Sequence, residues 1–362
     1  MKDITIVGNA RCYHAMDWFR SISGLIADTR RIEFLTDLID SESHIVLVRA
    51  DDPIVNLYNI DWLLLRRQSR FGDIWRNMIK LAAAPVQVLK LKTYARQHPD
   101  NVYHAHTMYY MFLSWLAGLH YVGTPQGSEV LVRPHRSRFY RYMSIRALRA
   151  ARLVTVDSSV MRDQIRTLAG VDAIIIQNGV EIEKLVACRS TGARDAVVSL
   201  RGFTDLYRIA EIAAARNRSR HKTELTFIYP FWTDDYKQSL QAELTPTDRD
   251  LGRLDKDAMF ALLGRTLLAI SIPRSDSSPR SVYEAIFAGA CVAATRAPWY
   301  EILPPCMKAR IFIVDLEQDG WLDSALDFAT QRRGQAYVPS PEAIEMFSQS
   351  RSMARAIGAI YT

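Results

Sequence analysis

The sequence lacks the features that mark disulfide-rich, membrane-spanning or secreted proteins. Its four cysteines are scattered and form no Cys-x-x-Cys pair, which excludes a disulfide scaffold and a zinc ribbon. No apolar run approaches the roughly 18 residues of a membrane span, and Asp3 interrupts any signal-peptide pattern. We therefore expect a soluble, cytoplasmic protein, and the length of 362 residues predicts two domains.

Motifs of several enzyme classes are also missing. The sequence has no P-loop pattern, no His-Glu-x-x-His, no Gly-x-Ser-x-Gly and no Gly-x-Gly-x-x-Gly after a predicted strand. The sequence therefore gives no support for a P-loop kinase, a zinc protease, an α/β-hydrolase or a nicotinamide dehydrogenase.

Positive charge is unevenly distributed along the chain, which has 46 Lys and Arg against 39 Asp and Glu. Residues 133–152 contain seven arginines and no acid, and residues 62–96 contain a basic block opposed only by Asp73. That block comprises Arg66, Arg67, Arg70, Arg76, Lys80, Lys90, Lys92 and Arg96. Both stretches carry large apolar residues such as Trp75 and Phe139, so they predict contact with a polyanion, an anionic lipid surface or an acidic partner. The alternative interpretation is that both stretches are helix faces exposed to solvent, with no binding role.

Short apolar runs alternate with longer helical patterns, which is typical of parallel sheets with crossover helices. The expected strands are Ile4–Val7, His44–Val48, Val102–His104, Leu153–Val156, Ala173–Ile176, Ala196–Ser199, Leu225–Tyr229, Leu267–Ser271, Val292–Ala294 and Ile311–Val314. The expected helices are Tyr109–Gly118, Ser158–Leu168, Asp205–Arg216, Asp257–Leu263, Val282–Ala288 and Glu342–Ala359. Two such series predict two doubly wound, Rossmann-like domains.

Turn residues divide the chain at Asn178-Gly179-Val180 and again at Pro339-Ser340-Pro341. We assign residues 1–180 to an N-terminal domain, 181–338 to a C-terminal domain and 339–362 to a helical segment that packs back on the first. Ligands of such folds bind at the carboxyl ends of the strands, so we expect functional residues just after strands, in a cleft.

The most informative segment passes from an apolar strand through a polar loop into a helix. Its loop is Pro273-Arg274-Ser275-Asp276-Ser277-Ser278-Pro279. We predict Ser278 as the N-cap and Pro279 as the first helical residue. The N–H groups near Ser281 and the positive end of the helix dipole suit an anion such as a diphosphate. Asp276 before the helix and Glu284 on its second turn can bind a sugar hydroxyl and a ribose diol; the alternative is a capped helix with both carboxylates solvated.

These residues resemble the retaining GT-B glycosyltransferases of family 4. Asp276 and Glu284 are similar to the acidic-x7-Glu motif of that family, with Asp276 in place of the usual glutamate. Further stretches resemble family motifs in the same order along the chain, namely Thr124–Leu131, Asp157–Ser159, Gln177–Glu181, Ser199–Gly202 and Tyr207-Arg208. The resemblance covers nearly the whole chain and implies a GT-B fold, with two Rossmann-like domains facing a central cleft.

The resemblance implies roles for residues on the donor side. Arg201 matches the arginine that stabilises the leaving phosphate, and Arg208 stands in for a family lysine that is missing here; the alternative for Arg208 is a surface arginine. Asp276 with the Ser277 and Ser278 backbone would hold the transferred sugar. The assigned catalytic residues are Asp276, Glu284 and Arg201. The assigned donor-binding residues are Arg201, Arg208, Ser277, Ser278, Pro279, Arg280, Ser281 and Glu284, the last of which would bind the ribose.

The resemblance places the acceptor in the N-terminal half. Gly8 follows the first strand, His14 matches the histidine of a His-x-x-x-Trp subgroup, and His106 follows a strand. The alternative for His14 is packing beside Trp18. We expect His104 in the core and place the rings of His104 and His106 on opposite sides of the strand, which argues against joint metal ligation.

Three more acceptor-side residues lie in the Thr124–Leu131 stretch. Gln126 stands where many relatives have a histidine, and it cannot act as a general base. Ser128 and Glu129 follow; Glu129 is either an acceptor-side base or a structural cap. Asp248-Arg249-Asp250 and Asp255-Lys256-Asp257 spell the Asp-x-Asp motif of metal-dependent glycosyltransferases, but neither follows an apolar strand, so we expect no metal site.

We therefore expect a retaining, metal-independent hexosyltransferase without a cofactor. Its partners would be a UDP- or GDP-sugar, a glycan or lipid-linked acceptor of lipopolysaccharide, capsule or exopolysaccharide biosynthesis, and the anionic inner face of a plasma membrane, with no nucleic acid. Two alternatives remain: a non-hydrolysing nucleotide-sugar 2-epimerase, and a catalytically degenerate nucleotide-sugar-binding subunit.

Overall fold

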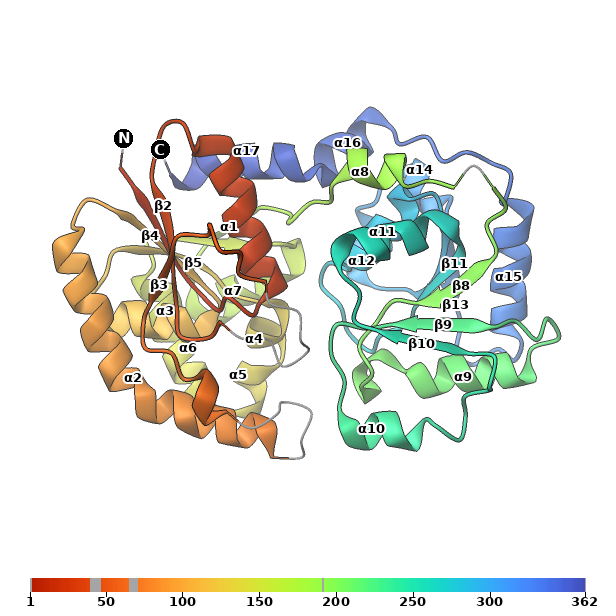
Figure 1. The fold of residues 1–362 in the computed structure, drawn as a ribbon, viewed down its shortest axis with the longest axis horizontal. Helices are drawn as coiled ribbons and strands as arrows, with labels where there is room; N and C mark the ends of the chain where they lie inside the picture. The colour runs from red at the N-terminus through yellow and green to blue at the C-terminus, as the bar shows by residue number, and fades with distance from the viewer. Residues whose placement is uncertain (1, 40–46, 65–70, 191, 362) are drawn as a thin grey trace. The chain divides into compact units, whose positions relative to one another are not determined.

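The computed structural model describes residues 2–39, 47–64, 71–190 and 192–361. The described chain forms two compact units, each built around a parallel sheet (Figure 1). The first unit contains the described residues of 1–178 together with 349–361, and the second contains those of 179–348. No helix within these described ranges is long and apolar enough to cross a membrane.

The sheet of the first unit has seven parallel strands in the order β3-β2-β1-β4-β5-β6-β7. The strands are β1 (Ile4–Val7), β2 (Ile32–Thr36), β3 (Ile54–Asn56), β4 (Val102–His106), β5 (Tyr121–Thr124), β6 (Leu153–Val156) and β7 (Ala173–Ile175). One apolar core includes side chains of α1 (Tyr13–Ile26) and α17 (Gln349–Ile360). A second core includes α2 (Gly72–Gln97), α3 (Met108–Leu116), α6 (Arg138–Ala150) and α7 (Ser159–Ala169). Helices thus cover both faces, as parallel sheets require.

Shorter elements complete the first unit. They are the 3-10 helix η1 (Asp61–Leu63), α4 (Gly127–Leu131) and α5 (Arg133–Arg136).

The sheet of the second unit has six parallel strands in the order β10-β9-β8-β11-β12-β13. They are β8 (Ala196–Ser199), β9 (Leu225–Ile228), β10 (Arg249–Gly252), β11 (Thr266–Ser271), β12 (Cys291–Thr295) and β13 (Ile311–Val314). One core includes α8 (Ile182–Ala187), α11 (Lys256–Arg265), α12 (Arg280–Phe287), α13 (Pro298–Glu301), α14 (Pro305–Lys308) and α16 (Pro341–Phe347). The other includes α9 (Ile209–Arg218) and α15 (Trp321–Gln331), with η2 (Asp205–Tyr207) and α10 (Asp234–Ser239) beside it.

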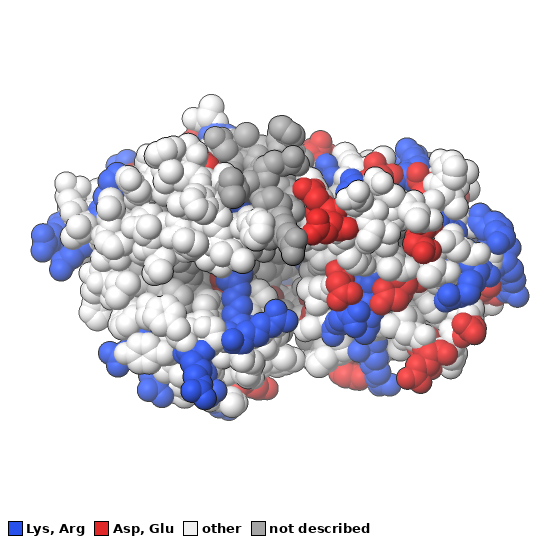
Figure 2. Space-filling model, turned by 90° about the horizontal axis from the view of Figure 1, so that it is seen from below, with Lys and Arg blue, Asp and Glu red and all other residues white. Residues whose placement is uncertain are grey.

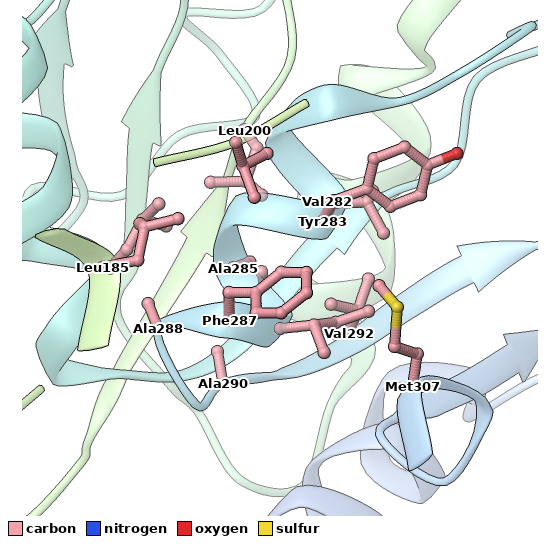
Figure 3. Close-up of a cluster of buried hydrophobic side chains, with 14 of the residues drawn as sticks. Leu185, Leu200, Val282, Tyr283, Ala285, Phe287, Ala288, Ala290, Val292 and Met307 are labelled. Carbon is pink, nitrogen blue, oxygen red and sulfur yellow. The ribbon is translucent and has the colours of Figure 1, made fainter. Parts of the chain in front are cut away.

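Helix α12 is anchored by its apolar side. Val282, Ala285, Ile286 and Phe287 are fully buried, and Figure 3 shows Phe287 beside Val292 of β12 within this core. Because this packing fixes the helix, it also fixes the loop and the polar residues at its start.

The predicted pair of Rossmann-like domains is confirmed, but several strands were not predicted: β2, β3, β5 and β10. Strand β10 consists of Arg249, Asp250, Leu251 and Gly252 at the edge of the sheet and is partly exposed, so it has no apolar run to reveal it. Of the predicted strand His44–Val48, residues 44–46 lie outside the described ranges, and residues 47 and 48 are not in a strand.

The predicted helix over 342–359 is two helices, α16 and α17, which meet at Ser348. Ser340 caps α16 by accepting a hydrogen bond from the Ala343 N–H at 3.2 Å. Phe347 of α16 is buried with its ring 4.5 Å from that of Tyr283 in the second unit. Residues 339–348 therefore belong to the second unit, whereas the sequence assigned them to the segment that packs on the first.

The end of α17 is held in the first unit by buried polar contacts. The Tyr361 hydroxyl lies 2.5 Å from His104 Nδ1 and accepts a hydrogen bond from Trp18 Nε1 at 3.3 Å. His104 Nε2 in turn lies 2.7 Å from Thr124 Oγ1. The chain end is thereby joined to β4 and β5.

Tyr361→Phe is expected to lower the free energy of unfolding by about 1–3 kcal/mol, because it leaves buried polar groups of Trp18 and His104 without a partner. Urea denaturation measures this loss. Tyr142→Phe is the matched control, since Tyr142 is exposed. Equal stabilities of the two variants would contradict the role given to the hydroxyl.

Candidate functional site

The loop between β11 and α12 carries most of the predicted donor-side residues. The N-cap of α12 is Pro279 and the first helical residue is Arg280, so the predicted cap at Ser278 is wrong by one residue. The Ser278 carbonyl accepts from the Arg280 N–H at 3.0 Å and the Pro279 carbonyl from the Val282 N–H at 2.9 Å. The Ser278 hydroxyl donates to the Tyr283 hydroxyl at 3.5 Å.

Arg201 is the centre of a polar cluster at this loop. Its guanidinium forms an ion pair with Asp276 and donates from Nη1 to Ser281 Oγ at 2.9 Å. The side chains of Arg201 and Asp276 are only 13% and 12% exposed. The Tyr207 ring lies 4.8 Å from the guanidinium carbon, a cation–π contact. Within the described residues, the buried Arg201 Nε has no hydrogen-bond partner.

The sheet order explains why these residues meet. Strands β8 and β11 are parallel neighbours, so Arg201, just after β8, and Asp276, after β11, lie at the same carboxyl edge. Gly202 permits a close approach there, because a Cβ at that position would lie 2.5 Å from the Phe231 ring.

Glu284 and Arg280 form a second ion pair on α12. Arg280 Nε donates to Glu284 Oε1 at 3.1 Å, four residues along the helix, and both side chains are nearly buried. Glu284 is therefore held on the buried side of the helix. Its assignment to a ribose stays a prediction.

Arg208 lies against the same loop as Asp276. It caps α9 in a left-handed conformation with φ of 52°, and its Nη1 donates to the carbonyl oxygens of Ile272 at 3.3 Å and Pro273 at 3.5 Å. Arg208 thus supports the start of the β11–α12 loop, in which Ser277 is half-buried. Its part in phosphate binding stays a prediction.

On the predicted acceptor side, Gly8 and His106 lie together in the first unit. A Cβ at Gly8 would meet the Phe34 ring at 2.9 Å and the His106 Cβ at 3.4 Å, so glycine is needed for this packing. Burial, with a smaller effect of the His14 charge, lowers the pKa of His106 to about 3. Among the described residues, His106 Nε2 has no hydrogen-bond partner. His14 itself is exposed on α1.

The two strand histidines correct one expectation. The rings of His104 and His106 lie 4.3 Å apart, so placing them on opposite sides of the strand was wrong: side chains two residues apart on a strand share a face. His104 is in the core as expected, and His106 is nearly as buried.

Glu129 acts as a cap. Its Oε2 accepts from the Gln126 N–H at 3.0 Å and from the Met108 N–H at 2.8 Å, and so joins the starts of α4 and α3. Burial raises the pKa of Glu129. Gln126 Nε2 donates to Cys12 Sγ at 3.2 Å, while Ser128 is exposed. These contacts favour the capping alternative for Glu129.

A buried polar network in the first unit was not predicted. Asp37 directly follows β2 and is fully buried, and it accepts hydrogen bonds from Tyr110 and, at 3.1 Å, from Gln87 Nε2. Lys80 Nζ lies 3.8 Å from Asp37 and 4.1 Å from the centre of the Tyr109 ring. Burial lowers the pKa of Lys80. The available signal was an acid directly after Ile32–Thr36, a stretch in which Glu33 interrupts the apolar residues and which had not been identified as a strand.

The two Asp-x-Asp patterns have structural partners. Asp248 is buried in an ion pair with Arg216, Asp250 lies 2.7 Å from Lys237 Nζ, and Asp255 caps α11. Among the described residues, no group of three or more His, Cys, Asp or Glu side chains is arranged to hold a metal ion.

Known proteins resemble this chain in sequence over part of its length and in fold over nearly all of it. The family model described as Glycosyltransferase Family 4 matches residues 44–184. No curated protein matches the sequence. The structure of HepE from Anabaena, in complex with UDP and glucose, has a TM-score of 0.75 and 14% identity and covers 99% of this chain and 98% of its own.

Two further solved structures extend this likeness. Sucrose-phosphate synthase from Thermosynechococcus elongatus has a TM-score of 0.71 and 13% identity, over 99% of this chain and 96% of its own. The lipopolysaccharide outer core galactosyltransferase WaaB has a TM-score of 0.61 and 12% identity, over 100% of this chain and 99% of its own. At these identities the likeness establishes the fold, and the expected GT-B class is confirmed.

Proposed function

We propose that this protein is a glycosyltransferase that moves a sugar from a nucleoside-diphosphate sugar to a glycan or lipid-linked acceptor. The observation that carries the proposal is the cluster of Arg201, Asp276 and Ser281 at the carboxyl edge of the second sheet, beside the start of α12. The Glycosyltransferase Family 4 match and the GT-B fold support it, as does the presence of UDP and glucose in the HepE structure.

The chemistry of the cluster suits a departing diphosphate. Negative charge develops on the phosphate oxygen as its bond to the anomeric carbon breaks, and preorganised donors that face this charge lower the barrier. The Arg201 guanidinium carries a permanent charge and can donate two parallel hydrogen bonds to phosphate. Ser281 and the Tyr207 ring hold the guanidinium in place, and the α12 dipole adds to the favourable field.

Asp276 orients Arg201 and, in this proposal, the hydroxyls of the transferred sugar, while Glu284 contacts the ribose. We propose that the reaction retains the anomeric configuration without a metal ion. The acceptor oxygen forms its bond to the anomeric carbon on the face from which the phosphate leaves, and its proton passes to the leaving phosphate oxygen. Positioning then supplies most of the catalysis.

The acceptor in this proposal belongs to a bacterial surface polysaccharide, made at the cytoplasmic face of a membrane. The likeness to the galactosyltransferase WaaB supports this class of acceptor. Gly8, His14, His106, Gln126 and Ser128 of the first unit are the residues proposed to lie on the acceptor side.

A panel of UDP- and GDP-sugars tests the donor site by thermal shift. A ligand at a hundred times its dissociation constant stabilises the folded state by about 2.7 kcal/mol, which raises the melting temperature by about 2–4 °C. We expect one nucleotide sugar to do so, and Glu284→Gln to lose the shift. Glu301→Gln, an exposed residue of the same unit, is the control and keeps it.

The products decide between the candidate activities. Slow release of free sugar from the stabilising donor, with retained configuration by NMR, supports the transferase. Formation of the 2-epimer overturns it in favour of an epimerase, and a panel without any stabilising nucleotide sugar refutes the donor site. Because Glu284 is buried, melting without ligand is compared first, and Ser281→Ala provides a second variant that also loses part of the shift.

A further inference from the structure

The outward face of helix α2 carries an apolar stripe. Phe71, at the N-cap, is followed by Ile74, Met78, Leu81 and Leu89, and each of these side chains is 58% to 68% exposed. Spacings of three, four and eight residues put them on one face of a helix. The opposite face is already used, because Ala83, Gln87 and Leu91 are buried in the first unit. A contiguous exposed apolar surface of this kind marks an interaction site.

Aromatic side chains extend the stripe at one end. Trp62 of η1 is 78% exposed, and η1 is attached to α2 because Trp75 Nε1 donates to the Leu63 carbonyl at 2.7 Å. Tryptophan at the margin of an apolar surface is typical of contacts with the membrane–water interface.

Basic residues outnumber acidic ones along the helices around the stripe. Residues 74–99 and 133–152 contain no Asp or Glu. Lys90, Lys92 and Arg96 are exposed at the end of α2. Helix α3 contacts both α2 and α6. Phe139 and Tyr142 of α6 are exposed. The exposed arginines of α5 and α6 are Arg133, Arg136, Arg138, Arg141, Arg146 and Arg149. Figure 2 shows this side, where white atoms dominate over the first unit, with blue groups and few red ones.

We propose that the α2 face, defined as the apolar stripe with Trp62 and the basic residues of α2, α5 and α6, docks on the surface of an anionic lipid bilayer. Apolar side chains enter the acyl boundary while Lys and Arg bind the headgroups. The α2 face fits nucleic acid poorly, because protein surfaces that bind nucleic acid are polar, whereas this face carries an apolar stripe. A second copy of the chain would set positive charge against positive charge across a two-fold axis. Arg66, Arg67 and Arg70 of the predicted basic block lie outside the described residues.

The inference depends on this surface alone and goes beyond sugar transfer. Cosedimentation with vesicles tests it directly. We expect the protein to pellet with phosphatidylcholine vesicles that contain phosphatidylglycerol, and much less with phosphatidylcholine alone. Raising the salt from about 0.1 M to about 1 M shortens the screening length from about 10 Å to about 3 Å and reduces binding.

Two variants separate the contributions to docking. Ile74→Ser/Met78→Ser/Leu81→Ser removes the apolar stripe, and Lys90→Glu/Lys92→Glu/Arg96→Glu reverses the charge. Each is expected to weaken vesicle binding about tenfold or more. Matched controls lie on exposed positions of the second unit: Val186→Ser/Ile302→Ser/Val338→Ser and Arg218→Glu/Arg265→Glu/Arg333→Glu. Both controls keep wild-type binding.

Three outcomes overturn the proposal. They are no pelleting with anionic vesicles, equal binding of variants and controls, and a concentration-dependent dimer in light scattering that the stripe variant abolishes. The thermal shift with the nucleotide sugar is measured on the same variants and stays unchanged. A loss of vesicle binding therefore reports on docking, and a failed donor panel reports on the proposed function.

Discussion

Replacing Arg201 by methionine is expected to reduce sugar transfer by about 10²–10³-fold, because the leaving phosphate loses its preorganised cation. Methionine keeps a long, unbranched side chain, so the packing under Tyr207 changes little. Steady-state kinetics with the stabilising nucleotide sugar measure the effect. Arg201→Lys keeps the charge but cannot form two parallel hydrogen bonds, so an intermediate loss is expected.

Arg274→Met is the control for this experiment. Arg274 lies in the same loop as Asp276, but its side chain is about half exposed and pairs with Asp205 and Glu211. We expect it to leave the rate nearly unchanged. Because Arg201→Met leaves Asp276 in a mostly buried place without its cation, melting is compared for each variant. Equal rates of Arg201→Met and Arg274→Met in folded proteins would refute the proposed donor site.

Lowering the pH from about 7.5 to about 5 is expected to remove on the order of 2 kcal/mol of stability through His106 alone. Burial lowers the pKa of His106 to about 3 in the folded protein, below about 6.5 in the unfolded chain. Between these values the unfolded chain binds more protons, so stability is complete above the unfolded pKa and falls as the pH drops toward the folded pKa. Burial also lowers the pKa of His104, so the two losses act in the same direction.

Urea denaturation across this pH range, with His106→Gln and His120→Gln, checks the effect. The His106 variant loses one titrating group, and its stability should depend less on pH by on the order of 2 kcal/mol over the range. His120 is exposed, and His120→Gln is the control for the loss of a histidine. Identical pH profiles for all three proteins would show that His106 does not titrate differently in the folded state.

Much of the fold could be predicted because most buried strands are short apolar runs that follow helical patterns. The strands that were not predicted lack an uninterrupted apolar run. Strand β5 contains Gly123, and β10 is a polar edge strand. The boundary at Ser348 was not predicted because the helical pattern continues across it, whereas the backbone of Ser348 is extended and forms a bridge with Val180.

The candidate site could be predicted in its residues but not in its contacts. The polar loop after β11 and the acids around α12 are visible in the sequence. The ion pair between Arg201 and Asp276 depends on β8 and β11 being neighbours in the sheet, which spans a separation of 75 residues. The contacts of Tyr207 with Arg201, and of Tyr110 with Asp37, also depend on tertiary packing. Helix α2 was not among the expected helices, although the sequence marked residues 62–96 as a stretch of basic and large apolar residues.

The second unit begins and ends at one place, where Val180 and Ser348 form a parallel bridge and the Val180 N–H donates to the Phe347 carbonyl at 2.7 Å. The described residues of the second unit follow one another along the chain, and the first unit contributes the segments before and after them. Because its two junctions lie together, a single pair of splice points would carry the whole second sheet.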